Sequence, residues 1–133
     1  MPTLEESIAV YRQAIGLRTQ RHEILASNIA NADTPNFKAR DIDFRSAIAA
    51  AIDQRGLKLQ TSQHGHFAIP LPGGNGPKLL FRNEYQSAVD GNTVEMDHER
   101  SQISDNAIQY QILTELLNDE FREMRQALTS QQG

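Results

Sequence analysis

The chain has 133 residues, a net charge of −4 at neutral pH and a mean hydropathy of −0.55. This length suggests one domain, and only eight aromatic residues (five Phe, three Tyr) argue against a large compact core. The absence of cysteine excludes a disulfide framework and a thiolate metal site. No basic stripe favours nucleic-acid binding, and no run of about 18 apolar residues predicts insertion into a membrane. The first residues, M-P-T-L-E-E-S, lack the pattern of a cleaved secretory signal.

A long helix is predicted over residues 4–32. Its apolar seam alternates by four and three residues, as in a heptad pattern. The seam consists of Leu4, Ile8, Tyr11, Ile15, Arg18, His22, Leu25, Ile29 and Ala32. A second stripe beside it consists of Val10, Ala14, Leu17, Arg21, Ile24 and Asn28. So wide a face, with polar interruptions, favours a helix that contacts several neighbours, although an ordinary bundle helix has the same pattern.

The sequence Asp33-Thr34-Pro35 predicts the end of this helix, because proline lacks a backbone N–H and biases the preceding residue away from the helical region. Just before it, Asn28 and Asn31 lie three residues apart and share one face. Two interpretations are open for these amides. They cap carbonyl groups left open at the helix end, or they form a polar contact surface for another chain.

The middle of the chain is predicted to be irregular. Residues 36–44 form a polar turn whose Ile42 and Phe44 fold back on the helix, and residues 44–55 form a short helix that stops at Gly56. Residues 57–93 are rich in glycine and proline, which is typical of loops. Within them, residues 57–61 and 79–85 are expected to pair as a small β-hairpin.

A second long helix is predicted to begin between Asn92 and His98. Asn92-x-x-Glu95 resembles a capping box, with Asp97 as a rival N-cap. The fold class is therefore mainly α, with long N- and C-terminal helices paired antiparallel in a coiled-coil-like way. We divide the chain into residues 1–45, 46–91 and 92–133, in which both termini form one assembly domain. The small apolar content predicts a marginally stable free chain whose helices consolidate on assembly.

No enzyme or cofactor site is predicted. His64 and His66 flank a glycine, but a zinc site needs three or four ligands and no nearby residue completes the set. The glycine-rich residues 73–76 lack the Lys-Ser/Thr of a phosphate-binding loop. No nucleophile elbow supports a catalytic triad, and the carboxylates of the second helix are expected to form a solvated face. Catalytic residues, metal ligands and cofactors are therefore all predicted to be absent.

Two separated motifs resemble the bacterial flagellar axial proteins, the family of rod, hook and hook-associated proteins. The first is S-N-I-A-N-A-D-T-P-N-F-K, continued by A-R-D-I-D-F, and the second is D-G-N-T-V-E-M-D-H-E-R, followed by Y-Q-I-L-T-E-L-L-N. The continuation is similar to the proximal rod proteins in particular. The resemblance covers residues 4–45 and 90–128 and is weak or absent between them.

The resemblance implies a structural subunit of the flagellar proximal rod, which assembles through its terminal helices into the tubular drive shaft after type III export. It implies as partners further copies of the chain, other rod proteins, the MS ring, the rod–ring junction protein and the export apparatus. The alternative is another axial protein or a rod–MS-ring junction or adaptor protein. A small helical enzyme, the third reading, would need a pocket and a clustered polar site that the sequence does not show.

The resemblance also implies a set of assembly residues, with roles in helix termination, turn shape and packing between subunits. In the first motif they are Asn28, Asn31, Thr34, Pro35 and Phe37. In the second they are Gly91, Asn92, Val94, Tyr110, Leu113, Leu116 and Leu117. Many axial proteins have tyrosine where this chain has Phe37, so the ring is kept as a packing residue without a hydroxyl contact.

Overall fold

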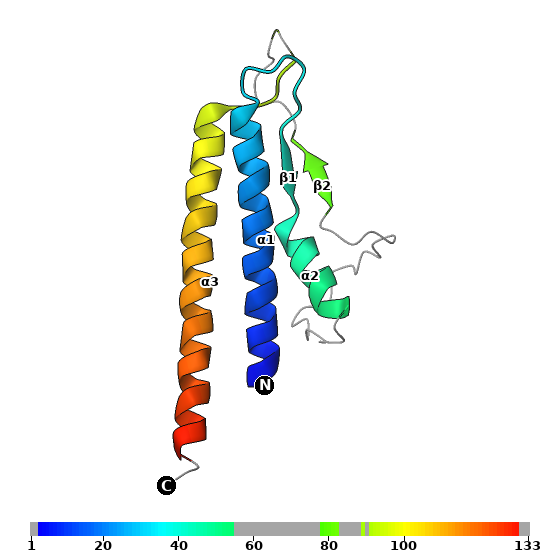
Figure 1. Cartoon of the computed structure of the whole chain (residues 1–133). Helices are drawn as coiled ribbons and strands as arrows, with labels where there is room; N and C mark the ends of the chain where they lie inside the picture. Colours follow the sequence, from blue (N-terminus) through cyan, green and yellow to red (C-terminus); the bar gives the residue numbers. More distant parts are fainter. Residues whose placement is uncertain (1–2, 55–77, 83–88, 90, 131–133) are drawn as a thin grey trace.

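The computed structural model describes residues 3–54, 78–82, 89 and 91–130, and it is mainly helical. Its elements follow the order α1 (Leu4–Ala30), β1 (Arg40–Ile42), α2 (Phe44–Gln54), β2 (Leu79–Phe81) and α3 (Met96–Ser130). Two long helices stand side by side, and the short helix and the two strands lie against one flank of α1 (Figure 1). This arrangement confirms the predicted fold class.

Helix α1 is bounded by local hydrogen bonds that the sequence supplies at both ends. The Thr3 hydroxyl accepts the Glu6 backbone N–H at 3.3 Å, and the Glu6 carboxylate accepts the Thr3 N–H at 2.7 Å, which completes a capping box. At the other end the backbone N–H of Asn31 bonds back to the carbonyls of Ser27 and Asn28. The helix therefore stops at Ala30, two residues before the predicted end, and Ala32 lies in the following turn.

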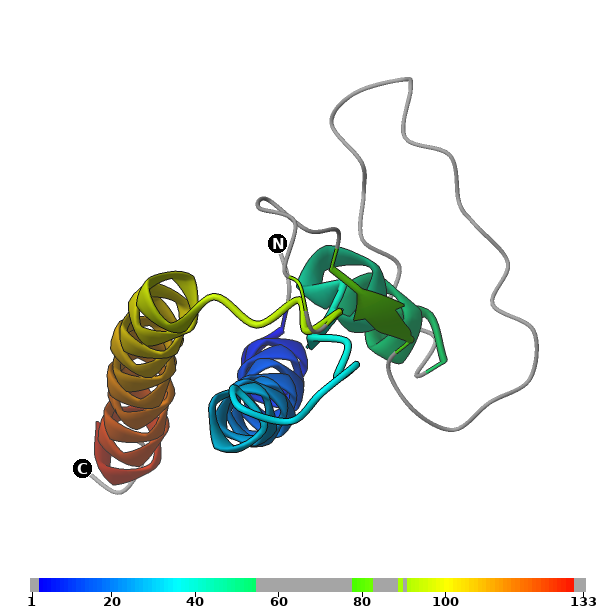
Figure 2. The ribbon, with the colours of Figure 1, turned by 90° about the horizontal axis from the view of Figure 1, so that it is seen from above.

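Helix α3 runs antiparallel to α1, as predicted (Figures 1 and 2). Two polar contacts fix the register, since Arg18 bonds Asn106 and Asn28 bonds Glu99. With 35 residues against 27, α3 is the longer helix. If Arg18 lies level with Asn106, the start of α1 lies level with residue 120, and about ten residues of α3, or roughly 15 Å, extend past it.

The start of α3 at Met96 lies inside the predicted window, but its cap differs from both candidates. The Glu95 carbonyl accepts the Glu99 N–H at 2.9 Å, so Glu95 is the residue before the helix. Asn92 lies too far upstream to cap it. Its side-chain oxygen instead accepts the Val94 N–H at 2.8 Å in a local turn, and the Asp97 side chain is exposed.

Helix α2 confirms the prediction for residues 44–55 and packs on α1, on the side away from α3 (Figure 2). It buries Ala47 and Ile52. The Asp43 carboxylate accepts the Ser46 N–H at 3.2 Å at its start. Ile42 and Phe44 fold back as predicted, with Ile42 buried and the Arg18 guanidinium 3.6 Å from the centre of the Phe44 ring. Gly56, the predicted stop, lies outside the described residues.

The small sheet pairs different segments from those predicted. Strand β2 lies within the predicted second strand, but its antiparallel partner is β1, with Arg40 opposite Phe81 and Ile42 opposite Leu79. Residues 40–42 were expected to be part of a polar turn. They are extended because their backbone bonds β2 along one edge and the Asn28 side chain along the other. Residues 57–61, the other half of the predicted hairpin, lie outside the described residues.

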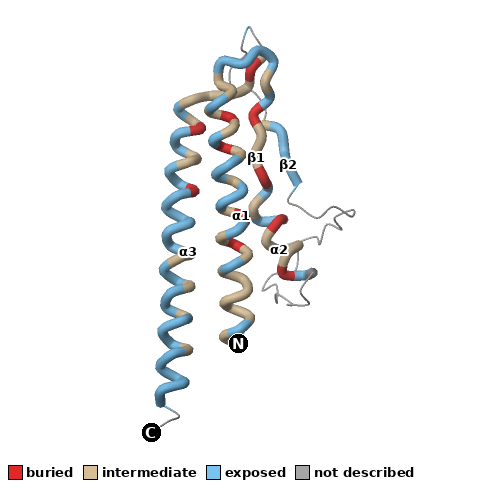
Figure 3. The backbone as a smooth tube through the Cα atoms, in the orientation of Figure 1, coloured by how far each residue is buried: buried red, intermediate tan, exposed pale blue. Residues whose placement is uncertain are grey.

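Burial is concentrated on α1 and the elements beside it, whereas most of α3 is exposed (Figure 3). The buried apolar residues are Ala14, Leu17, Leu25, Ala39, Ile42, Ala47 and Ile52. On α1, the second predicted stripe is thus buried at least as deeply as the first. His22, which was placed on the seam, is exposed. No helix among the described residues is long and apolar enough to cross a membrane.

Candidate assembly site

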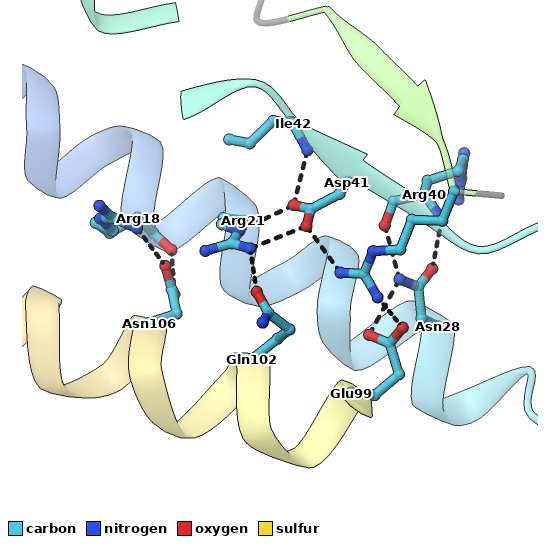
Figure 4. A network of polar contacts seen from close by, with 10 residues as sticks. Arg18, Arg21, Asn28, Arg40, Asp41, Ile42, Glu99, Gln102 and Asn106 are labelled. Carbon is cyan, nitrogen blue, oxygen red and sulfur yellow. Dashed lines mark hydrogen bonds and ion pairs between the residues drawn. The ribbon is translucent and has the colours of Figure 1, made fainter. Parts of the chain in front are cut away.

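Asn28 replaces a neighbouring strand for β1. Its side-chain NH2 donates to the Arg40 carbonyl at 2.7 Å, and its oxygen accepts the Arg40 N–H at 3.0 Å (Figure 4). Arg40 can make both bonds because its backbone groups point away from β2. The residues on either side of Arg40 make the bonds on the β2 side, and one example is Ala39, whose carbonyl accepts the Arg82 N–H. The Asn28 side chain is fully buried, so its hydrogen bonds are made within the chain.

Four charged side chains meet beside Asn28, and we call Arg21, Asp41, Arg82 and Glu99 the four-charge cluster. The Asp41 carboxylate forms ion pairs with the guanidinium groups of Arg21 at 2.9 Å and Arg82 at 2.7 Å. Arg82 also pairs with the carboxylate of Glu99. Arg21 further donates to the Gln102 side chain at 2.6 Å (Figure 4). Two cations and two anions balance, which a buried ionic group requires. The cluster joins α1, β1, the residue after β2 and α3.

The pKa of Asp41 reflects this setting. Burial opposes ionisation of the carboxyl group, but hydrogen bonds from Arg21 and Arg82 outweigh it and lower the pKa to about 2. The hydrogen bond to Asp41 also raises the pKa of Arg21, against the effect of burial. Asp41 is therefore ionised at every physiological pH, so its ion pairs in the cluster persist throughout that range.

The turn after α1 is closed by Asn92, which lies about 60 residues farther along the chain. The Asn92 side-chain NH2 donates to the backbone carbonyls of Asn31, Ala32 and Thr34 at 2.8–2.9 Å. These carbonyls belong to the turn that follows α1, and those of Asn31 and Thr34 also accept backbone N–H groups within the turn. The backbone adds a further link, because the Thr93 N–H donates to the Phe37 carbonyl at 3.0 Å. The turn and the segment before α3 therefore form one joined structure.

Two residues with left-handed backbone conformations lie next to each other where the turn after α1 meets the segment before α3. Asn36 has φ 60° and Gly91 has φ 71°. A Cβ atom placed on Gly91 would lie 2.6 Å from the Asn36 side-chain oxygen, which is closer than real contacts allow. The Lys38 ammonium group donates to the Gly91 carbonyl at 2.6 Å. Glycine is thus required at position 91 both by conformation and by space.

The far part of α3 is different in character. Ile108, Ile112 and Leu116 are 58%, 50% and 41% exposed, and we call these three residues the α3 outer stripe. Their spacing of four residues places them along one side of the helix, off the positions that contact α1, such as Asn106. Tyr110, Phe121 and Leu128 are further large exposed side chains on α3.

Comparisons with known proteins bear on this arrangement. A sequence model of the family described as flagella basal body rod protein matches residues 13–38. Flagellar basal body rod protein FlgB of Proteus mirabilis (strain HI4320) is 40% identical over 98% of this chain and 97% of its own length. FlgB of Escherichia coli (strain K12) is 40% identical over 96% of both chains, and FlgB of Salmonella typhimurium is 38% identical over 94% of both. The chain belongs to the FlgB family.

The FlgB family consists of structural proteins, so the chain is not an enzyme. The alignments with the FlgB relatives also span the middle of the chain, where the sequence resemblance was weak. The described residues contain no group of three or more His, Asp or Glu side chains that could hold a metal ion. His64 and His66 lie outside those residues.

The predicted assembly residues of the first motif gather at one end of the helix pair. Asn31 caps α1 by donating to the Ser27 carbonyl at 2.8 Å and accepts the Thr34 hydroxyl at 3.2 Å. Thr34 and Pro35 are exposed, and Phe37 is half-buried. The first residues of the second motif, Gly91, Asn92 and Val94, contact this same turn or lie beside it.

The structure does not bring the remaining predicted residues to that place. Tyr110 and Leu116 are exposed along α3, whereas Leu113 and Leu117 are half-buried. For Asn31 the capping interpretation is confirmed, and for Asn28 the partner is the backbone of β1 rather than a helix carbonyl. Whether any of these residues contacts another subunit stays a prediction.

The sequence analysis missed the four-charge cluster. Arg21 was listed only as a member of the second stripe of the first helix, and Glu99 was included in a carboxylate face expected to be solvated. That expectation is wrong for Glu99, which is only 1% exposed. The available signal was position, because Glu99 lies four residues before the half-buried Ile103 and seven before the buried Asn106, on the side of α3 that faces α1.

Proposed function

We propose that this chain is a structural subunit of the proximal rod of the bacterial flagellum, exported by the type III apparatus. The near full-length similarity to FlgB proteins carries this proposal. The termini form the assembly domain, and residues 46–91 form a middle segment of which the described parts pack beside α1 and β1. In this scheme the rod is built by contacts of α1 and α3 with neighbouring subunits.

The α3 outer stripe supplies a surface for such contacts. Three large aliphatic side chains exposed in a row favour association with another helix, because burial of the exposed half of each contributes about 1 kcal/mol. The stripe and the turn after α1 are different surfaces at different heights along the molecule. A contact between two different surfaces gives a ring if its rotation closes and a helical array if it does not, and the second outcome has the geometry of a rod.

The proposed partners are further copies of this chain, other rod proteins, the MS ring, the rod–ring junction protein and the export apparatus. The proposed location is the periplasmic rod of the basal body, with no direct insertion into the membrane. We propose Thr34, Pro35 and Phe37 as contact residues, because the first two are exposed and the third is half-buried in the turn. Tyr110 and Leu116 are proposed as contact residues on α3.

Complementation of a strain that lacks the chain tests the proposal. The wild-type gene should restore rods and filaments seen by electron microscopy. A variant with Ile108→Gln, Ile112→Gln and Leu116→Gln should be made and exported at normal levels but should fail to build rods. The matched control, Gln111→Ala with Asn118→Ala, changes exposed polar positions of the same helix and should restore them.

The signature turn is tested in the same strain. Asn31→Ala with Pro35→Ala should permit synthesis of the chain but impair rod formation. Normal rods with this variant would remove Pro35 from the proposed contact set and would show that the cap made by Asn31 is not needed for assembly. Normal flagella in the strain that lacks the chain altogether, with no second copy of the gene, would contradict the function itself.

A further inference from the structure

Arg82 occupies a position that links the middle of the chain to both long helices. Its backbone N–H donates to the Ala39 carbonyl at 2.9 Å, which holds it beside the small sheet. Its guanidinium bonds the carboxylate of Asp41 at 2.7 Å and that of Glu99 on α3. Arginine is suited to this place, because its planar fork can serve two carboxylates at once.

Glu99 depends on this contact. Its side chain is 1% exposed, and its other bond among the described residues is a 3.3 Å contact from the Asn28 amide. An amide is a neutral donor and does not balance a buried negative charge. When a partner of a buried ion pair is removed, the charge that remains is strongly destabilising in that place. Without Arg82, either Glu99 must take up a proton or α3 must move away from α1, and both changes cost free energy in the closed helix pair.

We infer that Arg82 is a clasp that makes the pairing of α1 with α3 depend on the docking of β2. With β2 docked, Arg82 neutralises Glu99 and the helices close. With β2 displaced, the same carboxylate opposes closure. Such coupling is reciprocal, so closure of the helices also favours docking of β2. This inference does not depend on the proposed function, because it concerns the folded state of a single chain.

Hydrogen exchange of the full-length chain, followed by mass spectrometry, tests the clasp. The measurements are made in trimethylamine N-oxide, which favours burial and keeps a marginal chain folded. Arg82→Gln should accelerate exchange at the start of α3 and in the last turns of α1 by on the order of 100-fold. The control Arg100→Gln breaks an exposed 3.8 Å pair with Asp97 and should leave these rates unchanged.

The double variant Arg82→Gln with Glu99→Gln decides the mechanism. Removing the buried charge removes the need for the clasp, so the helices should recover protection to within about threefold of the Glu99→Gln variant alone. This comparison also holds if Arg82→Gln unfolds the whole chain. The inference is overturned if the double variant exchanges as fast as Arg82→Gln, or if Arg82→Gln loosens β2 while both helices keep their protection. Lack of protection in the wild-type helices would overturn it too.

Discussion

The two ends of the helix pair are built in opposite ways. At the end where α1 stops and α3 begins, which we call the joined end, the buried side chains of Asn28, Asn92 and Glu99 are polar, and each is hydrogen-bonded within the chain. Farther along α3 most residues are exposed (Figure 3), and they include the apolar α3 outer stripe. Although Leu25 and Ala39 are also buried near the joined end, polar groups buried at one end and apolar groups exposed at the other depart from the usual distribution.

The difference separates two tasks along one molecule. Buried polar groups with specific partners fix a single arrangement of the segments that meet at the joined end, because each group left unpaired would cost free energy. Exposed apolar groups gain free energy only when another surface covers them. The joined end therefore determines how the chain folds, and the far part of α3 remains available to other chains.

The largest effect on folding should come from Asn28→Ala. This change leaves the N–H and the carbonyl of Arg40 without partners and removes a donor from Glu99, so we expect a loss of about 3 kcal/mol in the free energy of unfolding. Urea unfolding followed by circular dichroism measures it. Asn118→Ala, at an exposed position of α3, is the matched control and should stay within about 0.5 kcal/mol. Equal effects would show that burial does not distinguish the two ends.

Asp41→Asn should act next most strongly, and its effect should depend on pH. Since the pKa of Asp41 is lowered to about 2, the carboxylate stabilises the fold fully above about pH 4 and loses that contribution as pH falls through 2. The shift corresponds to about 2 kcal/mol at neutral pH. The wild type should therefore lose more stability than the variant between pH 5 and pH 2. Parallel pH profiles for the two proteins would contradict the role given to Asp41.

Two glycines offer a matched pair with opposite signs. Gly91→Ala forces a Cβ against Asn36 in a left-handed conformation and should destabilise the joined end by about 1–2 kcal/mol. Gly16→Ala places a methyl group in open space on α1 and should stabilise the chain by about 0.5–1 kcal/mol. Thermal unfolding of both variants measures the two shifts. Two shifts of the same sign would remove the conformational argument at position 91.

The smallest effect on folding should come from the α3 outer stripe. Ile112→Gln removes an apolar side chain that is half exposed, so the free energy of unfolding should change by less than about 0.5 kcal/mol. Ile52→Gln, at a buried position of α2, is the contrasting variant and should cost several times more. If Ile112→Gln destabilised the isolated chain as much as Ile52→Gln, the stripe would belong to the fold and not to an assembly surface.

The parts of this fold that were predictable from the sequence are those governed by neighbours in the chain. Thr3 and Asn31 bound α1 through hydrogen bonds within a few residues, and the alternation of apolar positions predicted the long helices and α2. The pairing of β2 with β1 was not predicted, because the extension of Arg40 depends on Asn28, a residue of the preceding helix. A polar turn and a strand bonded to a side chain look alike in local sequence.

The four-charge cluster could not be assembled from the sequence for a related reason. Its members, Arg21, Asp41, Arg82 and Glu99, come from four separate elements or segments, and ordinary charged residues occur near each of them. Only the antiparallel register of α1 and α3, together with the position of β2, brings them to one point. The exposed α3 outer stripe was equally hidden, because periodicity gives apolar positions without saying which of them another element covers.

The bond between Asn28 and Arg40 has a consequence for the order of folding. It joins residues only 12 positions apart, whereas the contact of Asn28 with Glu99 joins residues 71 positions apart. Closing a loop of about ten residues takes roughly 10–100 ns, and distant contacts close more slowly at a greater entropic cost. The end of α1 and the start of β1 should therefore come together first and present a formed edge to which β2 and α3 are added later.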